Sequence, residues 1–270
     1  MEIWLKMKQK VLVLGGNGFI GRHLISALDE TYEVINFDRR VNSIEEIISN
    51  KFPDFVINCS ASQANANSMD SFEANIEFPM KCMKLLLKNT EKSFKWIQVA
   101  SYFELQIPLG RKDNYSLDKQ ICRSLLHRLE ENGSIKLTTI FLPHIFGKGE
   151  NTNRIIPSIT KNLQSGQIAE ISRGEQFLPI LGVKDCCSAI IATIQTDQLI
   201  CSATPMWYDS VKILASIMEN AISKSVVQIN PNKKSIDNSF PRVEFPPTVN
   251  NWTSKMSFND FISQLSTHIA

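Results

Sequence analysis

The segment Lys10–Gly21 constrains the fold more than any other part of the 270-residue chain. It begins with Lys10-Val-Leu-Val-Leu14, an uninterrupted apolar run that is typical of a strand buried on both faces. The glycine-rich turn Gly15-Gly-Asn-Gly-Phe-Ile-Gly21 follows at once, and residues 22–28 continue as a predicted helix. A buried strand, a tight turn and a helix in this order predict the first half of a βαβ unit.

The alternation of strands and helices continues to residue 142. Further predicted strands cover 32–37, 54–58, 94–100 and 137–142, and predicted helices cover 43–49, 71–87 and 116–131. Parallel strands joined by right-handed helical crossovers form a sheet with helices on both faces. We therefore expect an α/β fold with a doubly wound parallel sheet of the Rossmann type.

The alternation becomes irregular after residue 149, where a proline-rich stretch at 230–253 separates the last helices. We expect residues 1–149 to form the Rossmann domain, which would be the dinucleotide-binding part. Residues 150–270 would form mainly a smaller α/β annex that binds substrate, with residues 177–200 returning to the Rossmann sheet.

Composition excludes several classes of protein. Lys and Arg total 29 against 27 Asp and Glu, so the net charge of +2 provides no basic surface for nucleic acid. No run of about 18 apolar residues or secretory leader is visible, so we expect a cytoplasmic protein with no membrane partner. The six cysteines contain no C-x-x-C pair and lie at no zinc spacing, so we predict reduced thiols and no metal.

Three glycines with the spacing G-x-x-G-x-x-G lie at the junction of the first strand and helix. Such glycines let the backbone approach a pyrophosphate, while the helix N-terminus favours its negative charge. An ordinary tight turn would carry the same glycines, so the spacing alone leaves both interpretations open. The dinucleotide interpretation assigns cofactor contacts to Gly15, Asn17, Gly18, Phe19, Ile20 and Gly21.

The second predicted strand ends in Asp38, followed by Arg39 and Arg40. Dinucleotide-binding folds place an acid about 20 residues after the glycine turn, where it binds the adenosine ribose hydroxyls. A solvated turn carboxylate is the structural alternative. We expect NAD or NADP as cofactor, with NAD favoured because Asp38 would repel a 2′-phosphate, although Arg39 and Arg40 could clamp one.

Tyr115-Ser-Leu-Asp-Lys119 places a phenol and an ammonium one turn apart on the same face of a predicted helix. This spacing also arises by chance, and a surface pair is the alternative interpretation. The position favours function, because the pair opens the helix after the fourth strand. The carboxyl ends of the first and fourth strands line the crevice in which a dinucleotide lies in this topology.

Together these segments resemble the extended short-chain dehydrogenase/reductase family, also called the NAD-dependent epimerase/dehydratase family. The resemblance covers almost the whole chain, and its elements are the glycine turn, Asp38, Asp54–Ala61, Asn75, the pair Tyr115 and Lys119, and Leu142–Gly149. Residues 153–159, 173 and 183–190 look most like the nucleotide-sugar branch. Within this branch the chain is similar to the short 4-keto reductases that make CDP-linked dideoxysugars, such as CDP-abequose and CDP-paratose synthases.

The resemblance implies roles for individual residues. Tyr115 would be the catalytic acid/base that donates a proton to a sugar keto oxygen. Lys119 would bind the nicotinamide ribose and place a positive charge beside the phenol. The segment Cys59, Ser60 and Ala61 would contact the cofactor.

The resemblance also implies a catalytic hydroxyl at the end of the fourth strand, where this chain departs from the family pattern. Ungapped alignment puts Val99 at that position and Ser101 two residues later, which is about 6 to 7 Å along a strand. We expect Ser101 to serve if the strand end bulges or its register shifts. A site run by Tyr115 alone, or a degenerate site, stays open.

The family's Arg-x-x-Asn after the fifth strand is replaced here by Phe141-Leu-Pro-His144. We expect His144 to contact the diphosphate of the substrate, with packing in a loop as the alternative. Arg154 and Arg173 are expected to bind the same diphosphate, because guanidinium groups match phosphate oxygens. A solvated surface role is the alternative for both arginines.

The expected function is therefore that of an NAD(P)-dependent oxidoreductase that reduces a 4-keto-6-deoxy sugar on a nucleotide diphosphate. One alternative is an epimerase or dehydratase that uses bound NAD, although Ser101-Tyr-Phe-Glu104 supplies only one displaced acid for a dehydratase. A non-catalytic dinucleotide-binding regulator is the alternative from another class. The stripe Ile121, Leu125 and Leu129 suits a homodimer interface, and packing against the sheet explains it equally.

Overall fold

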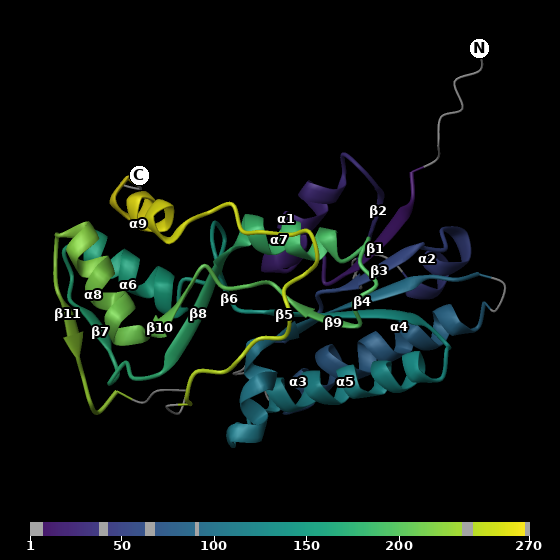
Figure 1. The fold of residues 1–270 in the computed structure, drawn as a ribbon, viewed down its shortest axis with the longest axis horizontal. Helices are drawn as coiled ribbons and strands as arrows, with labels where there is room; N and C mark the ends of the chain where they lie inside the picture. Colours follow the sequence, from purple (N-terminus) through teal and green to yellow (C-terminus); the bar gives the residue numbers. More distant parts are fainter. Residues whose placement is uncertain (1–7, 38–42, 63–67, 90–91, 234–239, 268–270) are drawn as a thin grey trace, which may run out of the picture. The chain divides into compact units, whose positions relative to one another are not determined.

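The computed structural model describes residues 8–37, 43–62, 68–89, 92–233 and 240–267. The chain divides into two compact units, each built from three segments (Figure 1). The first unit consists of Met1–Leu142, Cys186–Ala203 and Phe245–Trp252, and the second of Pro143–Asp185, Thr204–Glu244 and Thr253–Ala270. No helix in the described part of the chain combines the length and apolar character needed to cross a membrane.

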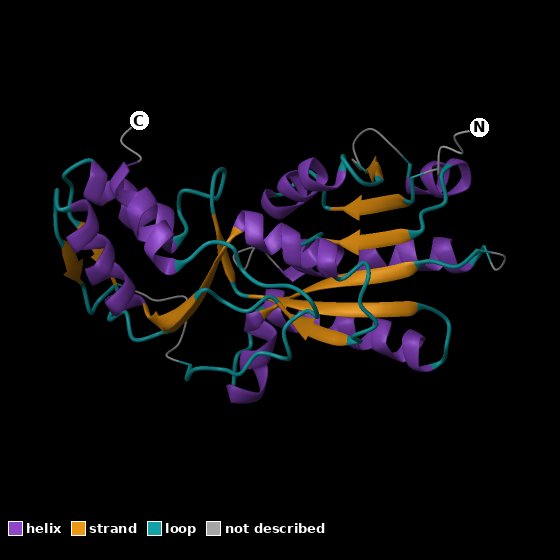
Figure 2. Cartoon of the chain, turned by 45° about the horizontal axis from the view of Figure 1, so that its top comes forward, coloured by secondary structure: helices purple, strands orange, loops and turns teal. Residues whose placement is uncertain are grey.

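A six-stranded parallel sheet with the order β2-β1-β3-β4-β5-β9 forms the centre of the first unit (Figure 2). Its strands are β1 (Lys10–Leu14), β2 (Glu33–Asn36), β3 (Phe55–Asn58), β4 (Lys95–Ser101), β5 (Lys136–Leu142) and β9 (Ile200–Ser202). The strand order reverses between β1 and β3, and ligands of open α/β sheets bind at the carboxyl ends of strands at such a point. The predicted doubly wound parallel sheet is confirmed.

Helices pack around this sheet in the first unit, and several of them share its buried apolar core. They are α1 (Phe19–Leu28), α2 (Ile44–Asn50), α3 (Ser68–Phe72), the π-helical turn η1 (Glu73–Glu77), α4 (Phe78–Leu87), the 3₁₀ helix η2 (Tyr102–Leu109), α5 (Asn114–Glu131) and most of α7 (Val183–Ala192). The apolar run of β1 is completely buried from Val11 to Leu14, as a strand covered on both faces requires.

The second unit contains a three-stranded and a two-stranded sheet packed with three helices. Its elements are β6 (His144–Phe146), α6 (Ile155–Gln164), β7 (Ala169–Ile171), β8 (Phe177–Gly182), β10 (Trp207–Ser210), α8 (Val211–Ile222), β11 (Val227–Ile229) and α9 (Phe258–Thr267). The return to the Rossmann sheet that we expected over 177–200 lies at Cys186–Ala203, where β9 pairs with β5. The apolar strand β8 instead pairs with β6 and β10, and its pattern would suit either sheet.

The helix η2 lies between the predicted strand at 94–100 and the predicted helix at 116–131, in a segment for which no helix or strand was predicted. Ser101 and Glu104 form a capping box at its start. The Ser101 hydroxyl accepts a hydrogen bond from a backbone N–H of the first helical turn, and the Glu104 carboxylate accepts one from the backbone N–H of Ser101. Gly110 ends the helix with φ of 102°, a left-handed conformation that suits glycine. The S-x-x-E spacing was therefore the sequence signal for this helix.

Candidate active site

The glycine turn between β1 and α1 contains very close backbone contacts. Gly15 has φ of +79°, and a Cβ there would lie 2.7 Å from Ser60 N. A Cβ on Gly21 would lie 2.2 Å from the carbonyl oxygen of Gly15, and one on Gly18 would lie 3.1 Å from it. Gly18 is the N-cap of α1, and no side chain caps this helix. The turn thus presents an uncapped helix N-terminus, an arrangement that suits an anionic group such as a pyrophosphate.

The other residues assigned to the cofactor from this region vary in exposure. Asn17 is exposed in the turn, and Phe19 and Ile20 are half-buried at the start of α1. Asp38 and Arg39 lie outside the described residues, so their roles stay predictions from the sequence.

The segment Cys59–Ala61 continues from β3 and packs against the glycine turn. The backbone N–H of Cys59 donates to the carbonyl oxygen of Leu14 at 2.9 Å, which extends the pairing of β3 with β1. Burial raises the pKa of the Cys59 thiol to about 12; Cys187 adds to the rise and the positive charge of Lys119 opposes it. Lys119 therefore lies close enough to this edge of the sheet for its charge to act there.

Tyr115 and Lys119 lie in the first two turns of α5. Asp113 caps this helix by accepting a hydrogen bond from Ser116 N at 2.9 Å, so α5 begins at Asn114. Tyr115 is half-buried, while Lys119 is 4% exposed with Nζ 6.0 Å from the centre of the Tyr115 ring. In the described part of the chain, no acceptor lies within hydrogen-bond distance of this ammonium. Its three donors are therefore available to ligand oxygens.

Residues around η2 support the ring of Tyr115, and no motif in the sequence indicated them. Phe103 meets Tyr115 edge to face, with ring centres 6.3 Å apart, and the Arg111 guanidinium lies 3.6 Å from the centre of the Phe103 ring. Arg111 also donates to Ser116 Oγ at 2.9 Å and forms an ion pair with Asp113. The network that caps α5 thus also holds Phe103 against the phenol.

Ser101 is the last residue of β4, and the strand is regular up to that point. Its pairing with β5 is unbroken through Ser101 and Leu142, so the bulge or register shift that we considered does not occur. Ser101 therefore stays two residues beyond the buried Val99. Ser101 Oγ accepts a hydrogen bond from Phe103 N at 3.3 Å, and this bond leaves the hydroxyl hydrogen available for donation.

One face of α5 carries four polar side chains at intervals of four residues, namely Tyr115, Lys119, Arg123 and His127. The last two connect the helix to its neighbours. Arg123 pairs with the buried Glu104 of η2, and His127 Nε2 lies 3.1 Å from Thr139 Oγ1 of β5. The helix face that carries Tyr115 and Lys119 is thus attached to η2 and β5 through the polar contacts of Arg123 and His127.

The histidine in this row makes stability depend on pH. Burial, and secondarily Arg123, lowers the pKa of His127, while Glu130 and Glu131 oppose the change. Because the folded state then binds the proton less well than the unfolded chain, the free energy of unfolding falls as pH drops below about 6.5. We expect the urea midpoint to fall in that range and His127→Gln to remove part of the fall. Identical pH dependence in both proteins would contradict this assignment.

In the second unit, the predicted substrate residues His144 and Arg154 contact each other. Arg154 Nη2 lies 3.0 Å from His144 Nδ1, and Arg154 Nη1 donates to the carbonyl oxygen of Ile145 at 3.0 Å. Glu150 Oε1 lies 3.2 Å from Arg154 Nη1 and 3.3 Å from His144 Nε2. Because a guanidinium only donates, His144 Nδ1 is the acceptor in its contact with Arg154. Arg173 is exposed between β7 and β8, outside this cluster.

A buried amide pair, which was not among the predicted site residues, lies near the glycine turn. Asn58 of β3 and Gln98 of β4 are register partners, and Asn58 Nδ2 donates to Gln98 Oε1 at 2.9 Å. Asn58 Oδ1 accepts hydrogen bonds from the backbone N–H and the hydroxyl of Ser60, at 3.1 and 2.5 Å. The pair thereby fixes the segment that packs against the glycine turn. The sequence indicates this pair only through the amide side chains of Asn58 and Gln98, which interrupt the mainly apolar strands β3 and β4.

The fold and this arrangement define a class: Rossmann-type proteins with a glycine turn after β1 and a Tyr-x-x-x-Lys pair on the helix that follows β4 and η2. Residues 11–200 match the model of the NAD dependent epimerase/dehydratase family. The protein belongs to that family, and the resemblance stated from its motifs is confirmed.

Individual relatives are distant in sequence. CDP-abequose synthase from Yersinia pseudotuberculosis is 25% identical over 215 residues, which cover 70% of this chain and 74% of that protein. GDP-6-deoxy-D-talose 4-dehydrogenase from Aggregatibacter actinomycetemcomitans is 22% identical over 250 residues, which cover 83% of each. The structure of the Bordetella bronchiseptica enzyme WbmG in complex with NAD and UDP gives a TM-score of 0.78 at 15% identity, covering 96% of this chain and 94% of that one.

Proposed function

We propose that the protein is an NAD(P)-dependent oxidoreductase that reduces a 4-keto-6-deoxy sugar carried on a nucleotide diphosphate. The observation that carries the proposal is the buried ammonium of Lys119 beside Tyr115, in the same unit as the uncapped glycine turn. The names of the relatives add the substrate class, since both refer to nucleotide-linked sugars. Asp38 favours NAD and Arg39 favours NADP, so both cofactors belong in the test.

The residues present fit such a cofactor. A side chain on Gly15 or Gly21 would collide with backbone atoms, so the turn keeps a bare backbone surface for a pyrophosphate. Lys119 would hold the nicotinamide ribose through its unused donors, and Cys59–Ala61 would contact the cofactor beside the turn. When bound, a reduced nicotinamide dinucleotide supplies the hydride that adds to the keto carbon.

Side chains of α5 and β4 then supply the proton that the keto oxygen takes up. Tyr115 donates its phenolic proton to the keto oxygen, which becomes the hydroxyl of the product. Lys119 stabilises the phenolate that is left, because its positive charge lies close to the ring. The bulge that we considered is absent, so Ser101 takes part in this proposal from the regular end of β4, where its hydroxyl hydrogen is free to be donated to the same keto oxygen and to orient it.

The second unit supplies the residues proposed for the diphosphate of the substrate. Arg154 is one-third exposed, so part of its guanidinium faces solvent while Glu150 and His144 fix the rest. His144 would then act mainly by orienting Arg154. Arg173, which is exposed, would contribute a second guanidinium.

One structural observation weighs against a dehydratase. Both carboxylate oxygens of Glu104 are engaged, one by Ser101 N and the other by Arg123, so this acid is committed to internal contacts. An epimerase with tightly held NAD and a non-catalytic dinucleotide-binding regulator remain as competing functions.

An assay of cofactor consumption by the purified protein distinguishes these functions. With NADH or NADPH and a CDP- or dTDP-linked 4-keto-6-deoxyhexose, we expect one reduced cofactor to be consumed for each sugar reduced, followed by absorbance. Cofactor that co-purifies in the oxidised form and is never consumed would identify an epimerase. Cofactor binding without turnover of any nucleotide sugar would identify a regulator.

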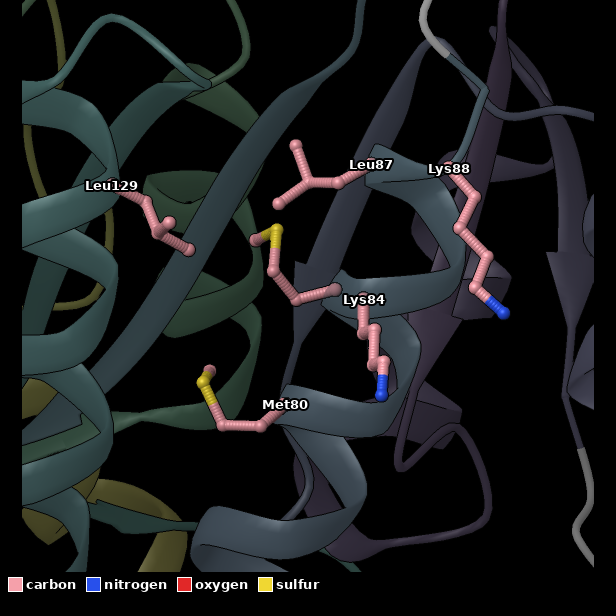
Figure 3. A pocket seen from close by; sticks show the side chains of 6 residues that line it. Met80, Lys84, Leu87, Lys88 and Leu129 are labelled. Atoms are coloured by element: carbon pink, nitrogen blue, oxygen red, sulfur yellow. The ribbon is translucent and has the colours of Figure 1, made fainter.

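We also propose a homodimer formed through α3, α4 and α5. Exposed apolar side chains on α3 and α5 include Met69, Phe72, Ile121 and Leu125. An apolar pocket beside them lies between α4 and α5, lined by Met80, Met83, Leu87 and Leu129, with Lys84 and Lys88 at its rim (Figure 3). Exposed apolar side chains gathered on neighbouring helices are typical of a protein interface.

Sedimentation velocity tests the dimer. We expect wild type to sediment as a dimer at micromolar concentration and Leu125→Glu to sediment as a monomer. Ile213→Glu, at an exposed apolar position on α8, is the matched control and should leave the dimer intact. A monomeric wild type would refute the proposal.

A further inference from the structure

The chemistry proposed for Tyr115 and Ser101 does not use the ion pair that joins α5 to η2. We propose that Arg123 and Glu104 are positioning residues that fix the Ser101 hydroxyl relative to Tyr115 and Lys119. This inference rests on the proposed function, and it assigns to the pair a role that is exerted through Ser101.

The carboxylate of Glu104 connects α5 to the backbone at the end of β4. Its side chain is fully buried, Oε1 accepts a hydrogen bond from Ser101 N, and Oε2 accepts one from Arg123 Nε, both at 2.9 Å. A buried carboxylate is tolerated only when its charge is paired and its oxygens are hydrogen-bonded. These two contacts therefore determine where the carboxylate, and with it Ser101 N, is held.

Arg123 lies on the same face of α5 as the catalytic pair, one turn after Lys119 and two after Tyr115. Its guanidinium also lies 5.3 Å from the centre of the Phe141 ring on β5, the strand next to β4. The arginine is thus held by both η2 and β5. A movement of α5 relative to the end of β4 would have to break these contacts first.

The side chain of Ser101 is fixed by a second, independent contact. Its Oγ accepts the hydrogen bond from Phe103 N, and Phe103 packs edge to face on Tyr115. The backbone of Ser101 is therefore held by Glu104 and its hydroxyl by Phe103. Without Arg123, Glu104 would turn toward water and release Ser101 N, and a displacement of about 1 Å at a reacting group can cost about 10²-fold in rate.

Stability alone does not explain the pair, because buried ion pairs can often be replaced by uncharged residues without loss of stability. A structural role and a positioning role therefore predict different behaviour in a double variant. Arg123→Met leaves a buried charge unpaired, whereas Glu104→Gln with Arg123→Met removes both charges. The double variant should recover stability, but not the link between α5 and Ser101.

The test measures kcat, KM for the nucleotide sugar, thermal stability and hydrogen exchange of the Ser101 and Phe103 amides. We expect Arg123→Met to lower kcat by about 10- to 100-fold with KM little changed, and to speed exchange at Ser101. The double variant should be more stable than Arg123→Met yet equally slow. Arg123→Lys should recover part of kcat, and Arg128→Met, at an exposed position on the same helix, should match wild type.

Three results would overturn the inference in different ways. Wild-type kcat in the double variant would show that the pair serves stability only. Unchanged exchange at Ser101 in Arg123→Met would refute the link itself, whatever the activity. A wild type that turns over no nucleotide sugar would refute the proposed function and with it the catalytic role, and faster exchange in Arg123→Met would then show a purely structural link.

Discussion

The Tyr115→Phe variant is expected to lose about 10³-fold in turnover while it binds NADH or NADPH as tightly as wild type. Only the phenolic oxygen is removed, and the ring can keep its edge-to-face contact with Phe103. Lys119 should therefore stay where it is, so the loss should appear in kcat. Fluorescence titration of the cofactor and steady-state kinetics measure the two effects separately.

A second tyrosine provides the control for this prediction. Tyr32 lies in the same unit and is 9% exposed, with its ring packed against Phe55. Tyr32→Phe should leave kcat unchanged. If Tyr115→Phe keeps more than about a tenth of wild-type activity, another group donates the proton, because general acid catalysis contributes at least about 10²-fold.

The Gly21→Ala variant is expected to bind the cofactor at least 100-fold more weakly. The added methyl group would lie 2.2 Å from the carbonyl oxygen of Gly15 and 2.7 Å from Gly16 Cα, and backbone atoms of a tight turn cannot move aside. The turn must open, which disturbs the N-terminus of α1 and should lower the free energy of unfolding by about 1–3 kcal/mol. Cofactor titration and urea unfolding measure these effects.

The Gly133→Ala variant is the control for Gly21→Ala, because it should lower the free energy of unfolding without changing cofactor affinity. Gly133 follows α5 with φ of +69°, and no atom lies within 4 Å of the position of an added Cβ. Backbone strain should cost about 1–2 kcal/mol there, while cofactor affinity stays unchanged. Wild-type affinity in Gly21→Ala would mean that the glycine turn is not the pyrophosphate site.

The parts of the fold that follow from local signals were predictable from the sequence. The apolar run of β1, the glycine turn and the spacing of Tyr115 and Lys119 each depend on residues close together in the chain. The partner of β8 was not predictable, because a strand that is apolar throughout can pack in either sheet. The helix η2 was missed because Pro108 and Gly110 outweighed the capping-box spacing of Ser101 and Glu104.

The contacts that organise the candidate site are less accessible to sequence reasoning. Glu104 and Arg123 are 19 residues apart, and no periodic pattern indicates that they meet. Arg154 was expected to be a ligand for phosphate, and its contacts with His144 and Glu150 depend on how β6 and α6 are placed. Such contacts are decided by tertiary packing, so only the structure reveals them.

The central claim is that this chain holds a nicotinamide dinucleotide and uses Tyr115 to complete a hydride transfer to a sugar. The most direct test follows deuterium from NADH or NADPH labelled at both C4 positions into the product, by mass spectrometry and NMR. We predict one deuterium on the carbon that carried the keto group, and no labelled product from Tyr115→Phe. An unlabelled product, or bound cofactor with no product from any nucleotide-linked 4-keto sugar, would contradict the claim.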